Sequence, residues 1–184
     1  MMNRREKRKR ISNNSIITPI DLNIWLENCT SKKVRHHTTF TENFQIEFWY
    51  DKHYWDRLHL GDNDGERISI EFDYVEPLVI NSFKHLIYYS QKHRDLLFVN
   101  HPPSKPRNIR VVLRQKFENK VTLNIVLEYH FIDFNNFEVT IVTAMSIDDF
   151  RLSDNQYAIE FDENDFNLYR LINKKVIKLD FYNE

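Results

Sequence analysis

The chain has 184 residues, of which 41% are hydrophobic and 14% aromatic, and its formal net charge is −1. This length predicts one domain with room for an appendage, and this much apolar surface excludes a globally disordered chain. The only glycines are Gly61 and Gly65. The sequence therefore excludes a glycine-rich phosphate loop, a dinucleotide fingerprint and a nucleophile elbow, because each needs more glycines.

The cysteine content and the hydropathy of the chain indicate the cellular compartment to expect. Cys29 is the single cysteine, which excludes an internal disulfide and a cysteine-based zinc site and favours a reducing compartment. No run of about 18 apolar residues is present, so we expect no membrane span and a cytoplasmic protein. No group of residues has a specific metal-ligand spacing, and we expect neither a metal nor another cofactor.

The N-terminal part is predicted in two pieces. Residues 1–15 form a disordered basic tail, with six basic residues in the first ten. Residues 16–39 form a helical extension, in which Thr18 is the N-cap and Pro19 the first helical residue. This helix is expected to end near 28–30, and a polar loop over 31–39 follows it.

Residues 40–184 are predicted as a single α+β domain with an acidic C-terminal extension. Residues 40–50 alternate apolar and polar side chains and predict a half-buried strand. Residues 51–60 suit a short helix with Asp51 near its N-cap, and a glycine-containing turn follows at 61–65. Asp73 and Glu76 have capping-box spacing before a helix over 74–93.

The remainder of the chain predicts consecutive strands with a hairpin turn at Asp133–Asn136. The strands are expected near 96–100, 109–115, 121–131, 137–145, 156–161 and 175–182. Helices that precede a run of strands predict an α+β fold in which N-terminal helices are followed by an antiparallel β-meander sheet.

His53 and Arg57 are the first candidates for chemistry. Residues at i and i+4 lie on the same face of a helix, so the two side chains would lie side by side. A histidine exchanges protons near neutral pH, and an arginine suits phosphate oxygens. Together they match what RNA cleavage by 2′-hydroxyl attack requires. The alternative is an exposed histidine and an ion pair from Arg57 to Asp56 or Glu47.

The order of motifs around this pair resembles a known nuclease group. His53-Tyr-Trp-Asp-Arg57 precedes a helix, and strands containing Val111-Val112-Leu113, Leu123–Leu127 and Val139–Ala144 follow. Over about 50–145 the chain resembles the group that joins barnase, EndoU, colicin-type and RelE-type toxins (a BECR-like nuclease domain). The resemblance implies a metal-independent ribonuclease, which is often the toxin of a toxin–antitoxin pair or a delivered effector.

The resemblance also implies roles for individual residues. His53 would be the general acid or base, Arg57 the phosphate clamp, and Thr143 the terminal threonine of the last core strand, with Thr140 as second choice. Because the two threonines are three residues apart, an ideal strand would place them on opposite faces, so we expect at most one at the site. Ordinary β-branched strand residues are the alternative for both.

Further candidates lie in the basic middle of the chain. His130 shares strand parity with Glu128 and is a candidate second acid or base, with a half-buried strand histidine as the alternative. Residues 84–120 carry a local charge of +7, which suggests an anionic ligand but also fits solvation of loops and strand faces. The residues assigned to RNA binding are Arg110 and Arg114, which share a face by their spacing, and Lys84, Lys92 and Arg94.

The sequence thus predicts a metal-independent endoribonuclease whose partners are RNA, free or ribosome-associated, and a cognate antitoxin or immunity protein. Two alternatives stay open. One is a non-catalytic accessory protein of a phage or mobile element that binds nucleic acid or protein. The other is an immunity or antitoxin protein that uses its acidic end against a basic toxin.

Overall fold

A computed structural model of the chain describes residues 25–41, 45–60, 70–101, 108–116, 122–162 and 165–183. The tail at 1–15, the helix start at Thr18–Pro19 and the turn at 61–65 lie outside these residues. Among the helices within these ranges, none combines the length and the apolar character needed to traverse a lipid bilayer.

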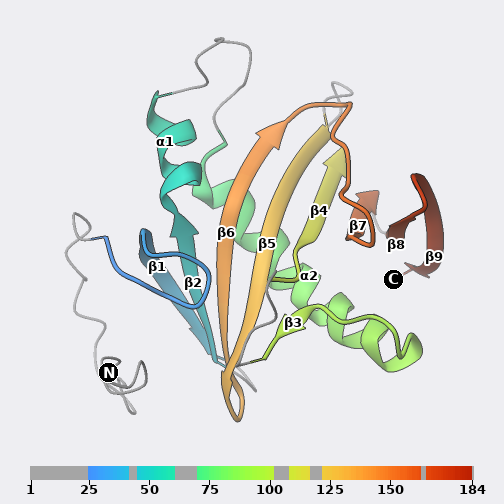
Figure 1. Cartoon of the computed structure of the whole chain (residues 1–184), viewed down its shortest axis with the longest axis horizontal. Helices are drawn as coiled ribbons and strands as arrows, with labels where there is room; N and C mark the ends of the chain where they lie inside the picture. Colours follow the sequence, from blue (N-terminus) through green and yellow to red (C-terminus); the bar gives the residue numbers. More distant parts are fainter. Residues whose placement is uncertain are drawn as a thin grey trace.

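The described residues form one large sheet and two helices (Figure 1). The helices are α1 (Lys52–Leu60) and α2 (Phe72–Lys92). The strands are β1 (Val34–Thr41), β2 (Gln45–Asp51), β3 (Val99–Asn100), β4 (Val111–Lys116), β5 (Thr122–Asp133), β6 (Asn136–Ser146), β7 (Tyr157–Asp162), β8 (Asp165–Ile172) and β9 (Lys175–Asn183). Their order across the sheet is β1-β2-β6-β5-β4-β7-β8-β9, with β3 beside β5.

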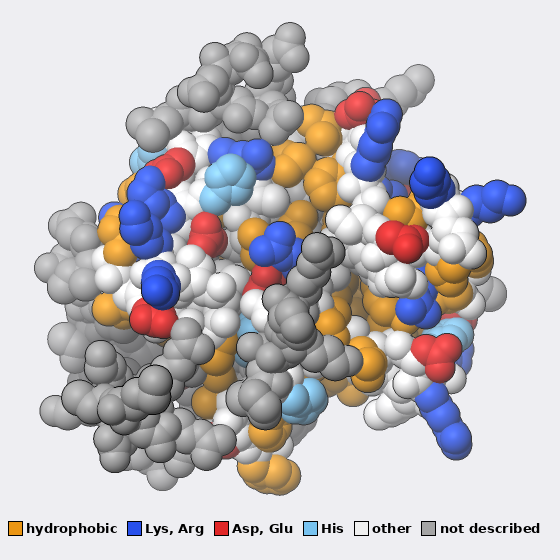
Figure 2. Space-filling view, viewed as in Figure 1, with side chains coloured by type: hydrophobic (Ala, Val, Ile, Leu, Met, Phe, Trp, Pro, Cys, Tyr) orange, Lys and Arg blue, Asp and Glu red, His pale blue; other side chains and the backbone are white. Residues whose placement is uncertain are grey.

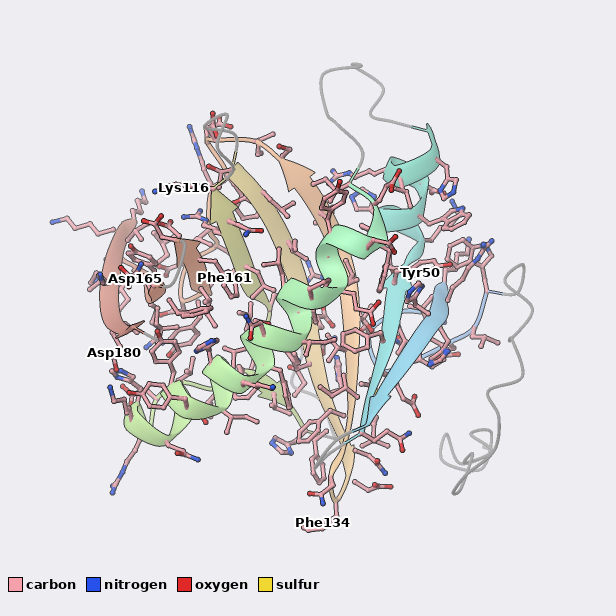
Figure 3. The ribbon with its side chains drawn as sticks, turned by 180° about the vertical axis from the view of Figure 1, so that it is seen from behind. Tyr50, Lys116, Phe134, Phe161, Asp165 and Asp180 are labelled. Atoms are coloured by element: carbon pink, nitrogen blue, oxygen red, sulfur yellow. The ribbon has the colours of Figure 1, made fainter. Side chains whose placement is uncertain are left out.

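Helix α2 covers one face of the sheet, which we call the back (Figure 3). Its buried stripe includes Val75, Val79, Phe83 and Leu86. The Phe83 ring stacks on Tyr129 of β5 at 5.6 Å between centroids. Because strand side chains alternate between faces, every second residue of β5 enters this core. The predicted helix over 74–93 is therefore confirmed as the element that closes the main core.

The fold is α+β, as predicted, but the sheet is mixed and the predicted antiparallel meander is wrong. The pairs β2–β6, β4–β7 and β3–β5 are parallel. The pairs β4–β5, β5–β6, β7–β8 and β8–β9 are antiparallel. A hydrophobic pattern identifies a strand and its buried face, but it carries no direction. The parallel pairs depend on long connections that no local pattern reveals.

The N-terminal prediction also requires correction. Residues 25–33 contain no helix, because Leu26 forms an isolated antiparallel bridge with Val34. The predicted loop over 31–39 overlaps β1, which pairs with β2 as an edge strand. The polar composition of this segment suits an edge strand as well as a loop, since only one side of it is paired.

Local signals were more informative elsewhere. Helix α1 lies where predicted, and Asp51 Oδ1 accepts the backbone N–H of His53 at 2.9 Å. Helix α2 begins at Phe72, and the N-cap residue Glu71 makes no side-chain cap hydrogen bond, so the predicted capping box is wrong. The hairpin at Asp133–Asn136 is confirmed, and Asn135 adopts φ 60° there. Strand β8 was not predicted.

The stacking of Phe83 on Tyr129 gives a test of this core. We expect Phe83→Ala to lower the free energy of unfolding by about 3–5 kcal/mol, because it removes a buried ring and leaves a cavity. Tyr74→Ala on the same helix is the control, since Tyr74 is 63% exposed, and it should change stability by less than about 0.5 kcal/mol. Chemical denaturation measures both, and equal losses would contradict the packing of α2.

Candidate functional site

The front face of the sheet, opposite α2, carries the candidate site, and a β-bulge determines which side chains reach it. Thr140 of β6 pairs with Glu128, Ile141 with Leu127, and Thr143 with Val126, so the register skips Val142. Ile141 belongs to the back core. The bulge places both Thr140 and Thr143 on the front. The expectation that they face opposite sides is therefore wrong.

Arg57 and Thr143 are brought together by the sheet topology. Strands β2 and β6 run parallel, with Tyr50 beside Ile141, so both approach the same edge of the sheet. Helix α1 follows β2 directly and lies next to the end of β6. There Arg57 Nη1 donates a hydrogen bond of 2.5 Å to Thr143 Oγ1. The structure thus brings Arg57 and Thr143, two residues that the resemblance singled out separately, into direct contact.

His53 lies one helical turn before Arg57 on α1. Its side chain is exposed, and its backbone position is fixed by the Asp51 cap. Asp56, a suggested alternative partner of Arg57, forms an ion pair with Lys52. The site thus combines an exposed imidazole with a half-buried guanidinium on one helix.

His130 lies on the same face but is buried. It is 3% exposed, and its Nε2 lies 3.3 Å from Glu128 Oε2 and 3.2 Å from Thr30 Oγ1. The predicted shared face of Glu128 and His130 is correct. The second acid or base proposed at His130 is covered in this structure.

Glu128 is a buried carboxylate held by several donors. Arg110 Nε donates to its Oε1 at 2.8 Å, and Asn108 Nδ2 donates to its Oε2 at 2.6 Å. Burial raises the pKa of Glu128, but hydrogen bonds from His130, Arg110 and Asn108 outweigh it and hold the pKa below its ordinary value. Glu128 is therefore ionised at neutral pH.

Thr140, on the same face, contacts the segment that precedes β1. Asn28 Nδ2 donates to Thr140 Oγ1 at 2.6 Å, and both residues are buried. Glu138, which pairs with His130 across the strands, accepts the Cys29 N–H at 2.9 Å. Thr140 is thus part of a buried polar cluster rather than of the Arg57 pair.

Arg110, which immediately precedes β4, and Arg114 of β4 share the front face, as their spacing predicts. Arg110 is engaged with Glu128. Arg114 Nη2 donates to the Phe150 carbonyl at 2.8 Å, and its guanidinium lies 5.9 Å from the Phe150 ring. Burial lowers the pKa of Arg114, while Glu160 partly opposes this. Figure 2 shows basic side chains on both sides of the front face, with hydrophobic side chains between them.

The other basic candidates lie elsewhere. Lys84 and Lys92 are on α2, behind the sheet, and Arg94 follows its C-terminal end. Lys92 Nζ lies 3.3 Å from Asp180 Oδ2 on β9 and over the Tyr88 ring. Figure 3 labels Asp180 at this end of α2. The basic side chains of 84–120 that the structure describes are therefore divided between two faces of the sheet.

Sequence reasoning missed the residues that cover His130. Asn28 and Thr30 come from a segment predicted as helix and loop, and nothing local links them to strands about 100 residues later. Polar residues inside β5, at Asn124, Glu128 and His130, were the available signal, because buried polar side chains inside a sheet require partners.

Comparison with protein-family models, curated proteins and solved structures gives no significant match to this chain. Among the residues that the structure describes, no group of three or more His, Cys, Asp or Glu side chains is arranged to hold a metal ion. The chemistry available at the site is proton exchange by His53 beside hydrogen-bond donation by Arg57 and Thr143.

Glu128 predicts a specific dependence of stability on pH. Its folded pKa lies below the ordinary value of 4.5, so its stabilising effect is complete above that pH and is lost as the pH falls through the folded pKa. We expect Glu128→Gln to remove this part of the acid dependence and to destabilise the protein at pH 7 by about 2–4 kcal/mol.

Glu160→Gln is the matched control for this measurement. Glu160 pairs with the exposed Lys116 at 3.3 Å, and such pairs contribute less than about 1 kcal/mol. Urea unfolding between pH 3 and 7 compares the variants. An unchanged acid dependence in Glu128→Gln would show that Glu128 is not the ionised group that the cluster stabilises.

Proposed function

We propose that this protein is a metal-independent endoribonuclease that cleaves RNA by attack of the 2′-hydroxyl on the adjacent phosphate. The observation that carries the proposal is the hydrogen bond from Arg57 to Thr143, with His53 one helical turn away. Guanidinium and hydroxyl donors suit phosphate oxygens, and an exposed histidine can move the proton.

The roles follow from the chemistry of the step. The 2′-hydroxyl loses a proton as its oxygen bonds to phosphorus, and the 5′-oxygen gains a proton as its bond to phosphorus breaks. His53 is the proposed acid–base residue. Arg57 and Thr143 donate hydrogen bonds to the phosphate oxygens, where negative charge increases in the transition state. The products are a 2′,3′-cyclic phosphate and a 5′-hydroxyl.

Arg114 extends the proposed RNA surface across the front face. Its strand β4 lies two positions from β6 in the sheet, which corresponds to about 10 Å between strand axes. An RNA strand that crosses the sheet from α1 would meet Arg57 first and Arg114 next. Lys84, Lys92 and Arg94 lie on the α2 side and are not part of this proposed surface.

We further propose that the enzyme is the toxin of a toxin–antitoxin pair, or a delivered effector, that acts in the cytoplasm. This assignment rests on the likeness to the barnase, EndoU, colicin-type and RelE-type group. Helix α1 with His53 and Arg57 precedes α2, and the β5–β6 hairpin brings Thr143 to the same edge. A cognate antitoxin or immunity protein is the expected partner.

The second candidate function is RNA binding without cleavage. The burial of His130 favours it, because the proposed site then contains one exposed histidine rather than two. A binding module would retain salt-dependent affinity for RNA and would give no cyclic phosphate products.

RNA cleavage by the purified protein tests the proposal. We expect cleavage in the presence of a chelator, with 2′,3′-cyclic phosphate ends, and a loss of about 100-fold or more in His53→Ala, because a general acid–base residue contributes at least that much. Electrophoresis of a labelled single-stranded RNA measures the rate and identifies the ends.

His59→Ala is the matched control, since His59 is an exposed histidine of the same helix, and its ring packs against Trp55 at 3.6 Å between centroids. It should cleave at nearly the wild-type rate. Full activity in His53→Ala would disprove its role. RNA binding without products in the wild type would favour the binding module.

The Arg57–Thr143 pair is tested by a double-mutant cycle. We expect Arg57→Ala to slow cleavage about 100- to 1000-fold, because it removes a donor to the transition state, and Thr143→Val to slow it less. Because the two side chains are hydrogen bonded, the effects should be coupled by about 0.5–3 kcal/mol. Additive effects in single-turnover cleavage would show that the two residues act independently.

A further inference from the structure

Residues 25–31, which we call the strap, cross the front face of the sheet before β1 begins (Figure 1). Consecutive strap residues contact the sheet. Asn28 Nδ2 donates to Thr140 Oγ1 at 2.6 Å, the Cys29 N–H donates to Glu138 Oε1 at 2.9 Å, and Thr30 Oγ1 lies 3.2 Å from His130 Nε2. These contacts attach the strap to β5 and β6.

The strap is shaped for these contacts by one side chain. Asn28 Oδ1 accepts the backbone N–H groups of Thr30 at 2.8 Å and of Ser31 at 2.9 Å. This Asx turn fixes the local backbone before docking. Asn28 is buried, with 3% of its surface exposed. Its side-chain oxygen holds the turn of the strap, and its side-chain nitrogen binds the strap to β6.

The other end of the strap contacts α1. Trp25 packs edge-on against Trp55 of α1 at 6.4 Å between ring centroids. The Arg35 guanidinium contacts both indoles, 4.2 Å from the Trp25 ring centroid and 4.4 Å from the Trp55 ring centroid. The edge-to-face aromatic contact and the cation–π attraction both favour this arrangement.

The strap thus connects the two elements that supply the proposed phosphate site. Trp55 is two residues from Arg57 on α1, and Thr140 is three residues from Thr143 on β6. A segment fixed at both points restrains the position of α1 relative to β6, and that position sets the hydrogen bond between Arg57 and Thr143.

We propose that the strap is a positioning element, which holds α1 against β6 through Trp25 and Asn28 and so keeps Arg57 on Thr143. This inference rests on the proposed ribonuclease function and identifies how that site is maintained. The Glu128–His130 pair serves as the anchor for Thr30. His130 is then a positioning residue and not the second acid or base.

Asn28→Ala tests the proposal, with Ser31→Ala as its control. Ser31 lies in the same turn, and its hydroxyl accepts the N–H of the exposed neighbour Lys33 at 3.2 Å. We expect Asn28→Ala to raise amide hydrogen exchange in α1 by about tenfold or more while α2 stays protected. We also expect RNA cleavage to fall about 10- to 100-fold, because misplacement of catalytic groups has costs of this size.

Each outcome of the exchange experiment decides the proposal. Faster exchange confined to the strap and α1, with Ser31→Ala like the wild type, supports it. Wild-type exchange in α1 of Asn28→Ala overturns it, as does an equal increase in α1 and α2, which would indicate general destabilisation. If the wild type cleaves no RNA, the proposed function fails, and the exchange data alone decide whether the strap holds α1.

His130→Gln separates the anchoring role from acid–base catalysis. We expect slower cleavage with the same dependence on pH as the wild type, because His53 still carries the proton. Loss of one limb of the pH profile in this variant would overturn the anchoring role. Unchanged cleavage together with unchanged exchange in the strap would overturn it as well.

Discussion

The bulge between β5 and β6 is the constraint on which the front face depends. Ile141 and Leu127 pair with each other in the α2 core, and one unpaired residue, Val142, then shifts the alternation so that Thr143 faces forward like Thr140. In a regular strand Thr143 would enter the apolar core with its hydroxyl unsatisfied, which is costly. The bulge therefore allows β6 to place Ile141 in the hydrophobic core behind the sheet and both threonines in polar contacts in front of it. The bulge also sets the distance between the Arg57 site and the buried cluster, because Arg57 contacts Thr143 and Asn28 contacts Thr140, and both threonines belong to β6.

The two faces of the sheet are stabilised by different physical effects. Behind it, α2 buries aromatic and aliphatic side chains, and this packing is tolerant because dispersion has little direction. In front, the cluster around Glu128 depends on matched donors and acceptors: Asn108, Arg110 and His130 meet one carboxylate. Such a network specifies one arrangement, since a partly satisfied one is unfavourable. Directional hydrogen bonds therefore hold residues 28–30 of the strap on the sheet, which suits the positioning role proposed for it.

The sequence was informative where the signal was local. Period-two patterns located β5 and β6, helical spacing located α2, and the Asp51 cap located α1. Arg57 and Thr143 were each candidates from the sequence, but their contact was not predicted, because it depends on the parallel pairing of β2 with β6. What failed depended on distant partners. Residues 25–30 carry helix-compatible side chains, but Leu26 pairs with Val34 and Asn28 with Thr140. The burial of His130 and the separation of Lys84 from Arg114 follow from tertiary packing that no short window contains.

The parallel pairing of β2 with β6 also has a consequence for biosynthesis. Gln45 lies beside Asn136, so about 90 residues separate the paired strands in the sequence. At typical synthesis rates of about 5–20 residues per second, β6 is synthesised on the order of ten seconds after β2. Until β6 emerges, the β1–β2 hairpin presents an open edge. Contacts of such long sequence separation also slow folding. The β5–β6 hairpin, with its two-residue turn at Phe134–Asn135, is the local structure onto which the earlier strands can assemble. A hairpin from the middle of the sequence is then the template for the strands that are made first.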